Sequence, residues 1–254
     1  MNRPLFNREM VRLQARELLR DSRYFWFALI FPFFMLGLFL FLSSVVPSNP
    51  GGPDLKPVVV PIALFLAASS VGLTITAGPL AGLRSRGTLR LLGTTPLGVG
   101  RFLVTHVSVR LAFVIVQICA LLAVAMAFGS IRVTQLPALL GVSLLGTVLF
   151  GAIGYLIGGR LRSPEVAANV GTLIQLGALF MSGLALPPQI LPSGVRTFFE
   201  WIPSSSLGDL LLHLVPAGSP SHPAWVSVLV LVGTTVAFAV ATLVTFRWDD
   251  GARV

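Results

Sequence analysis

Long apolar stretches are the feature that most limits what this chain can fold into. Six stretches long enough to cross a bilayer are almost free of charge. A helix of about 20 apolar residues crosses the hydrocarbon core, where only a helix or a closed barrel satisfies its backbone hydrogen bonds. We therefore expect an all-α integral membrane protein, folded as a single transmembrane domain over residues 1–254. Its six transmembrane helices are expected at about residues 25–46, 58–83, 107–129, 136–159, 166–186 and 224–246.

The composition supports a membrane protein and limits its chemistry. Of 254 residues, 55% are hydrophobic and only 11% are charged, too few to cover a soluble protein of this size. The first apolar run is too long for a cleaved signal peptide, so we expect none. The single cysteine, Cys119, excludes an internal disulfide, and we expect it to be a small buried apolar side chain.

Positive charge is distributed unevenly between the loops that six spans would leave. Fourteen arginines fall on one side of the membrane, whereas the other side receives only Lys56, Arg132 and Arg196. Cytoplasmic loops carry the excess of positive charge, so we expect both termini in the cytoplasm. The arginines lie beside the spans without any base-reading motif, so we expect no nucleic-acid partner despite the net charge of +9.

The start of the third span is set by the cost of burying an arginine. A helix entering the membrane at Arg101 would carry Arg110 about 13 Å deep, at 1.5 Å per residue. We therefore start the membrane portion near Leu111, with His106 and Arg110 on a helical extension below the membrane or snorkelling to its surface. The alternative is a functional arginine inside the membrane.

The sequence lacks the motifs of an enzyme that would act on its own. It has no phosphate-binding loop, and its only lysine, Lys56, lies in an outer loop. It also has no metal-ligand spacing and no nucleophile elbow. A membrane-embedded enzyme acting on lipids would depend on Glu165, Glu200 and Asp209, but Glu165 is expected inside and the other two outside. The confident spans hold no acid, which argues against proton-driven transport.

Three polar residues share one face of the expected fifth span. Asn169, Thr172 and Gln175 follow one another at steps of three residues. Such residues form hydrogen bonds between membrane helices. The alternative is that they line a polar substrate path at a subunit interface.

Two segments outside the spans are amphipathic. Residues 4–23 place Arg8, Arg12 and Arg16 on one face of a helix and apolar side chains on another, which is typical of a helix lying on the membrane surface. It serves either as an anchor or as a docking surface for a cytoplasmic partner. Before the last span, prolines divide an apolar loop into short pieces, which we expect to be re-entrant outer helices. Trp201 suits the membrane interface there.

Three segments together resemble the membrane subunits of type-2 ATP-binding-cassette (ABC) exporters. They are "GTLRLLGTTPLGVGRFL" at 87–103, "GYLIGGRLRSPEVAANVGTLIQLGALFMSG" at 154–183 and "LPPQILPSGVRTFFEWIPSSSLGDLL" at 186–211. The first is similar to the family's cytoplasmic segment after the second span. The second is similar to its fourth-to-fifth span signature, and the third to its outer segment before the last span.

The resemblance implies partners, a cellular location and site residues. A second permease subunit, identical or not, would pair with this one in the bacterial inner membrane, and spans one, two and five would line the path. Two cytoplasmic ABC ATPase subunits would bind ATP and Mg²⁺, so this chain would need no cofactor and would not be an enzyme. The residues implied in ATPase coupling are Arg8, Arg12, Arg16, Arg84, Arg86, Gly87, Thr88, Arg90 and Pro96. Those implied in an outer gate are Pro187, Pro188, Phe199, Trp201 and Pro203.

The chain departs from the family in its first marker segment. Members commonly have acids before the Gly-Thr pair, whereas here Arg84, Arg86 and Arg90 stand without acids. The partner surface would then be acidic, or the arginines would bind lipid phosphates. We expect a hydrophobic or amphiphilic cargo, such as a drug, a lipid or a lipid-linked glycan. The alternative function is ATP-independent lipid handling, as in a scramblase.

Overall fold

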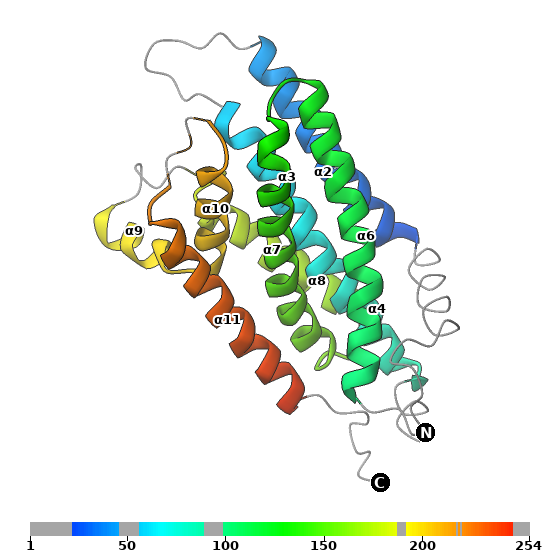
Figure 1. Ribbon diagram of the computed structural model, residues 1–254. Helices are drawn as coiled ribbons and strands as arrows, with labels where there is room; N and C mark the ends of the chain where they lie inside the picture. Colours follow the sequence, from blue (N-terminus) through cyan, green and yellow to red (C-terminus); the bar gives the residue numbers. More distant parts are fainter. Residues whose placement is uncertain are drawn as a thin grey trace, which may run out of the picture.

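Every regular element in the described part of the chain is a helix, which confirms the expected all-α fold. The computed structural model describes residues 22–45, 56–88, 99–186 and 192–245, except 217 and 219. Long helices form one bundle, and two short helices lie near one end of it (Figure 1). The helices are α2 (Ser22–Val45), α3 (Lys56–Gly72), α4 (Thr74–Ser85), α6 (Val99–Ala127), η1 (Val133–Gln135), α7 (Leu136–Gly158), α8 (Pro164–Met181), α9 (Ser193–Glu200), α10 (Pro203–His213) and α11 (Ala224–Thr245).

Five helical segments are long and apolar enough to cross a membrane. They are Phe25–Val45, Lys56–Ser85, Val104–Ala127, Val133–Gly158 and Ala224–Thr245. The fifth expected span corresponds to α8, an 18-residue helix that begins at a Ser163 cap and is not among these five segments. A sixth crossing at α8 therefore stays a prediction.

The second expected span is a broken helix at the centre of the bundle. Residues Lys56–Ser85 form α3 and α4, which are separated at Leu73, and 94% of their most apolar window is buried. The Thr76 hydroxyl crosses the break and donates to the Val71 carbonyl oxygen at 2.9 Å. Helices α2, α6, α7, α8 and α10 pack around this pair. The expectation that span two lines a path between subunits is therefore wrong, because helices of its own subunit enclose it.

Glycines let α7 pack directly on the backbone of the central helix. A β-carbon at Gly154 would overlap the carbonyl oxygen of Gly72. One at Gly158 would lie 2.6 Å from the carbonyl oxygen of Ala77. Small residues four apart allow such close approach between membrane helices. The two glycines thus seat α7 across the break between α3 and α4.

A proline in α2 is accommodated by polar side chains from two neighbouring helices. Pro32 has no N–H group, so the carbonyl of Ala28, one turn earlier, lacks its usual intrahelical donor. Gln117 on α6 donates to that oxygen at 3.0 Å, and Ser70 on α3 donates at 3.4 Å. In a membrane, neighbouring side chains commonly satisfy a carbonyl freed in this way.

Four of the described arginines lie at one end of the bundle. Helices α4, α7 and α11 end there, and α6 and α8 begin there (Figure 1). We call it the basic end, defined by Arg84, Arg86, Arg160 and Arg162. Lys56, Arg132 and Arg196 belong to the opposite end. The structure thus separates the basic residues as the sequence predicts.

The segment before the last span does form two short helices, with different surroundings. The residues of α10 from Ser204 to Leu212 are buried. In contrast, α9 is exposed, and Phe198 and Trp201 at its end are 67% and 59% exposed. Whether the two helices enter a bilayer stays a prediction, and the amphipathic helix expected at residues 4–23 falls almost entirely outside the described residues.

One expectation about the third span is wrong. Cys119 lies on the exposed surface of α6 and is not a buried core residue. The face of α6 that packs against the bundle is the one that carries His106, Arg110 and Gln117.

Candidate functional site

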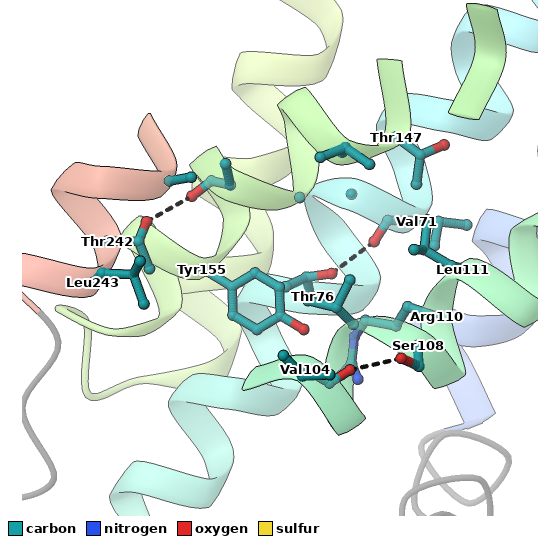
Figure 2. Close-up of a pocket in the computed structure, with 16 residues that line it drawn as sticks. Val71, Thr76, Val104, Ser108, Arg110, Leu111, Thr147, Tyr155, Thr242 and Leu243 are labelled. Atoms are coloured by element: carbon teal, nitrogen blue, oxygen red, sulfur yellow. Dashed lines mark hydrogen bonds between the residues drawn. The ribbon is translucent and has the colours of Figure 1, made fainter. Parts of the chain in front are cut away.

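A cavity of about 380 Å³ lies between α6, α7 and α11, near the basic end (Figure 2). The junction of α3 and α4 closes its back through Val71, Gly72 and Thr76. Both α6 and α11 pack on α7, which forms the floor between them. Most of its wall is apolar, as at Leu111 and Val148.

A buried polar pair stands at the basic end of the cavity. Nδ1 of His106 on α6 and the hydroxyl of Tyr155 on α7 are hydrogen-bonded at 2.6 Å, and their rings meet edge to face at 5.4 Å. Exposure is 1% for His106 and 5% for Tyr155. The pair joins α6 to α7 inside the bundle, so His106 does not snorkel.

Arg110 also turns inward, contrary to the expectation that it snorkels. It is 6% exposed, and Nη2 donates to the carbonyl oxygen of Ile75 on α4 at 3.2 Å. Nη1 donates to the carbonyl oxygen of His106 at 3.3 Å. Pro79 lies four residues after Ile75 and has no N–H group, so it leaves that carbonyl without an intrahelical donor. Arg110 therefore has a defined structural role inside the membrane-spanning bundle.

The three polar residues of α8 do not share one environment. Gln175 is 7% exposed, and its amide donates to the Leu66 carbonyl oxygen on α3 at 3.5 Å, which agrees with helix–helix bonding. Thr172 donates within α8 to the Ala168 carbonyl oxygen at 3.0 Å. Asn169 is exposed on the outer face of α8. None of the three lines the cavity of Figure 2.

The residues expected to couple to an ATPase lie at the end of α4, as far as they are described. Arg84 is half-buried, and Arg86 is exposed with its Nε donating to the Gly82 carbonyl oxygen at 3.1 Å. Gly87 adopts a left-handed conformation, with φ of 71°, where α4 ends, and Thr88 follows. The remaining members of that set lie outside the described residues: Arg8, Arg12, Arg16, Arg90 and Pro96.

Small residues bring the end of α4 into contact with the start of α8. A β-carbon at Gly78 would lie 3.3 Å from the β-carbon of Ala168, and one at Gly82 would lie 3.6 Å from Cγ of Pro164. Ala77, Ala81 and Ala167 form a small buried cluster at the same contact. The end of α4 that carries Arg84 and Arg86 therefore packs directly on α8, the helix that carries Asn169.

Comparison with known proteins supports the same family as the sequence motifs. A family profile described as "ABC-2 family transporter protein" matches residues 54–244. The chain belongs to the ABC-2 transporter family. A Bacillus subtilis (strain 168) protein named "Putative transport permease YvfS" is 30% identical over 95 residues, 37% of each chain. The chain therefore aligns with about a third of the length of this curated relative. Family membership and the membrane-type helices make it a multi-pass membrane transport protein.

The described residues that were expected in an outer gate lie around the turn from α9 to α10. Pro203 begins α10, and the Ser205 hydroxyl donates to the Phe199 carbonyl oxygen at 2.6 Å. The ring of Trp201 lies 5.4 Å from that of His222, just before α11. Pro187 and Pro188 lie outside the described residues.

The acids do not converge on a catalytic site in the described residues of the ABC-2 chain. Asp209 accepts from the backbone N–H groups of Ser221 and His222, at 2.9 and 3.2 Å, and contacts the His222 ring at 3.3 Å. Glu200 pairs with Arg196 at 2.7 Å on the surface of α9. Glu165 lies in the first turn of α8, at the basic end. Within these residues, no three potential metal ligands lie together.

Sequence reasoning missed two residues that line the cavity, Tyr155 and Gly151. Tyr155 lies in the marker segment of the fourth span, but its partner on α6 is 49 residues away. A usable signal was present for Arg110, because a proline inside an apolar helix requires a donor from elsewhere.

Proposed function

We propose that this chain is the permease subunit of an ATP-driven ABC exporter that moves a hydrophobic or amphiphilic substrate outward. Two such subunits, identical or related, would form the transporter in a bacterial inner membrane. Both termini would be cytoplasmic, because the basic end would then face the cytoplasm, as positive loops do. ATP and Mg²⁺ would bind only to two cytoplasmic ATPase subunits.

The contact between α4 and α8 is the observation that carries the proposal. The end of α4 holds the expected coupling residues Arg84, Arg86, Gly87 and Thr88. Its small side chains leave little free space against the first turns of α8. Closely packed helices transmit displacement because protein interiors are dense and yield little. An ATPase pushing on the end of α4 would therefore move α8.

The outer face of α8 is the best-supported lining of a path between two subunits. Asn169 is exposed there, beside Leu173 and Phe180, which are 68% and 56% exposed. A polar amide among apolar side chains suits an amphiphilic substrate. Helix α2 has exposed aromatic residues and is the other expected lining helix, whereas α3 and α4 are enclosed.

An exit gate at the opposite end would involve α9 and α10. Helix α9 projects its apolar residues outward, while α10 is anchored against α8 and α11. Movement of α8 would reach the turn at Phe199 and Trp201 through α10. Movement of α4 at the basic end would thus open the outer gate at the opposite end.

The decisive experiment is co-purification with candidate ABC ATPase subunits from the same genome. We expect a stoichiometric complex whose ATP hydrolysis changes when this chain is present in nanodiscs. Arg86→Glu, or scrambling of residues 87–96, should abolish the complex. Arg196→Glu, a matched reversal at the opposite end, should leave it intact.

Two results would decide against the proposal. The first is failure of every candidate ATPase to bind the folded chain. The second is lipid transfer across vesicles at an unchanged rate without ATP or ATPase, which would favour the scramblase alternative.

A further inference from the structure

We infer that the cavity between α6, α7 and α11 binds the acyl chain of a phospholipid from the surrounding bilayer. The chain enters sideways between α6 and α11, and its headgroup lies toward the basic end. This inference does not depend on ATP-driven export. It requires only that the bundle spans a membrane, so the two proposals can fail separately.

The size and position of the cavity suit such an occupant. Its volume of about 380 Å³ lies within the range of roughly 300–1,000 Å³ that is typical of small-molecule sites. Three rim residues are substantially exposed: Val104 at 47%, Val148 at 40% and Leu243 at 56%. They come from the three membrane-type helices around the cavity (Figure 2 labels Val104 and Leu243). The opening therefore faces the side of the bundle, where lipid chains lie.

The serine and threonine hydroxyl groups of the wall all donate hydrogen bonds to backbone carbonyl oxygens. The hydroxyl groups of Thr76, Thr147 and Ser108 each donate to a carbonyl oxygen of the central helix or of their own helix, at 2.8–2.9 Å. The Thr242 hydroxyl donates to the Ala152 carbonyl oxygen on α7 at 3.1 Å (Figure 2). A buried water needs two to four polar partners. A wall whose hydroxyl hydrogens are already used favours hydrocarbon over water.

Gly151 contributes to the width of the cavity at its floor. It faces the cavity from the floor helix α7, and a β-carbon there would meet no atom within 4 Å. On the same helix, Gly154 and Gly158 are required by close packing, whereas Gly141 and Gly151 are both open, and of these two only Gly151 lines the cavity. Its missing side chain enlarges the cavity where a chain would lie.

The polar end of the cavity fixes the direction of the bound lipid. Tyr155 and Arg110 lie there, and Figure 2 shows both beside Val104. Arg110 lines the cavity while its guanidinium reaches back to the Ile75 carbonyl oxygen. The opposite part of the wall, around Thr147 and Val148, is toward the middle of α7. The chain terminus would therefore point to the bilayer centre and the headgroup to the basic end.

The test uses a phospholipid with a photoreactive diazirine on one acyl chain, incorporated into nanodiscs with the full-length protein. After illumination, mass spectrometry locates the adducts. We expect enrichment at Leu111, Val148 and Leu243 over Val116 and Leu229. Those two reference residues are 69% and 63% exposed on α6 and α11 but do not line the cavity.

Cavity-filling variants provide the controls. Gly151→Leu should lower the cavity adducts about tenfold, equivalent to about 1.4 kcal/mol of binding free energy. Gly141→Leu should not, since position 141 on the same helix is equally open but outside the cavity. Leu243→Trp should also lower them, whereas Val244→Trp beside it should not. Leu243→Trp fills the cavity from an exposed position of α11, so the larger side chain does not disturb the packed core, and Val244→Trp is its matched control.

Two outcomes would overturn the inference. One is equal labelling of cavity and reference residues in the wild-type protein, which would indicate only the general lipid annulus. The other is cavity labelling that persists in both Gly151→Leu and Leu243→Trp while thermal unfolding shows that both are folded. Either result would leave the proposal of ATP-driven export unaffected.

Discussion

Arg110 donates to the backbone carbonyl oxygen of Ile75 at 3.2 Å, and this is the carbonyl that Pro79 leaves without an intrahelical donor. Seven residues along the same helix, Gln117 does the same for the carbonyl of Ala28, which Pro32 leaves free. Helix α6 therefore supplies hydrogen-bond donors to two carbonyl groups that prolines leave without one, on α4 and α2. Its strongly polar residues hold the bundle together where helix hydrogen bonding is interrupted.

This relationship predicts a specific energetic coupling. Arg110→Leu should destabilise the protein by about 2 kcal/mol, because it removes hydrogen bonds from a charged donor. In a Pro79→Ala background the new amide supplies a donor to Ile75, so the same substitution should cost at least about 0.5 kcal/mol less. Equilibrium unfolding in mixed micelles measures both values. Gln117→Leu serves as the control, since it should couple to Pro32→Ala and add independently to Pro79→Ala.

Close packing of α7 predicts that Gly154 tolerates no side chain. Gly154→Val should lower stability by about 3 kcal/mol, because a β-carbon there overlaps the Gly72 carbonyl oxygen and α7 must move away. Gly141→Val places the same side chain on the same helix in open space, so it should have little effect. Thermal unfolding in detergent compares the two. Equal melting temperatures would contradict the close contact.

For α4 and α6, the sequence predicted that each helix forms but not how its side chains pack. The apolar runs predicted both helices, and the arginine pattern predicted the basic end. The sequence predicts Arg110 below the membrane or at its surface, whereas its guanidinium turns inward to a carbonyl oxygen 35 residues earlier in the chain. The break at Leu73 was missed because it depends on how α7 crosses the central helix. The expected burial of Cys119 is wrong because the buried face of α6 is the one that carries His106, Arg110 and Gln117.

The hydrogen bond between His106 on α6 and Tyr155 on α7 predicts a second energetic coupling between two residues. Tyr155→Phe should reduce the free energy of unfolding by about 1 kcal/mol, because it removes the hydrogen bond with Nδ1 of His106. His106→Leu removes the same bond from the other side. The double variant should therefore be more stable than the sum of the single changes predicts, by at least about 0.5 kcal/mol. Strict additivity in unfolding experiments would argue against the bond.

The contact between α4 and α8 predicts an uncoupled transporter. Gly78→Leu would push α4 away from α8, because even a β-carbon at position 78 would lie only 3.3 Å from the β-carbon of Ala168. With the ATPase partner, transport should fall by about tenfold or more, within the usual range of coupling energies, while ATP hydrolysis continues. Transport and hydrolysis are measured together in proteoliposomes. Gly233→Leu, at an open site on α11, should change neither.

The acids near the opposite end should differ in importance. Asp209→Ala should cost about 2 kcal/mol, because its buried carboxylate accepts two backbone N–H groups from the residues that lead into α11. Glu200→Ala should cost less than about 1 kcal/mol, because it breaks only a surface pair with Arg196. Thermal unfolding ranks the two. Loss of transport by Glu200→Ala in a stable protein would instead favour an enzymatic role for the acids.

The enclosure of α3 and α4 has a consequence for how the protein is made. This pair is inserted early, after α2, whereas the helices that later cover it, α7, α8 and α10, are still to be synthesised. During that interval lipid must serve as its solvent, although in the finished protein its most apolar window is 94% buried. Its apolar side chains therefore serve twice, first to hold the nascent helix in the bilayer and then to pack the bundle. Polar substitutions there should be detected during biogenesis, as failed insertion, before any effect on transport could arise.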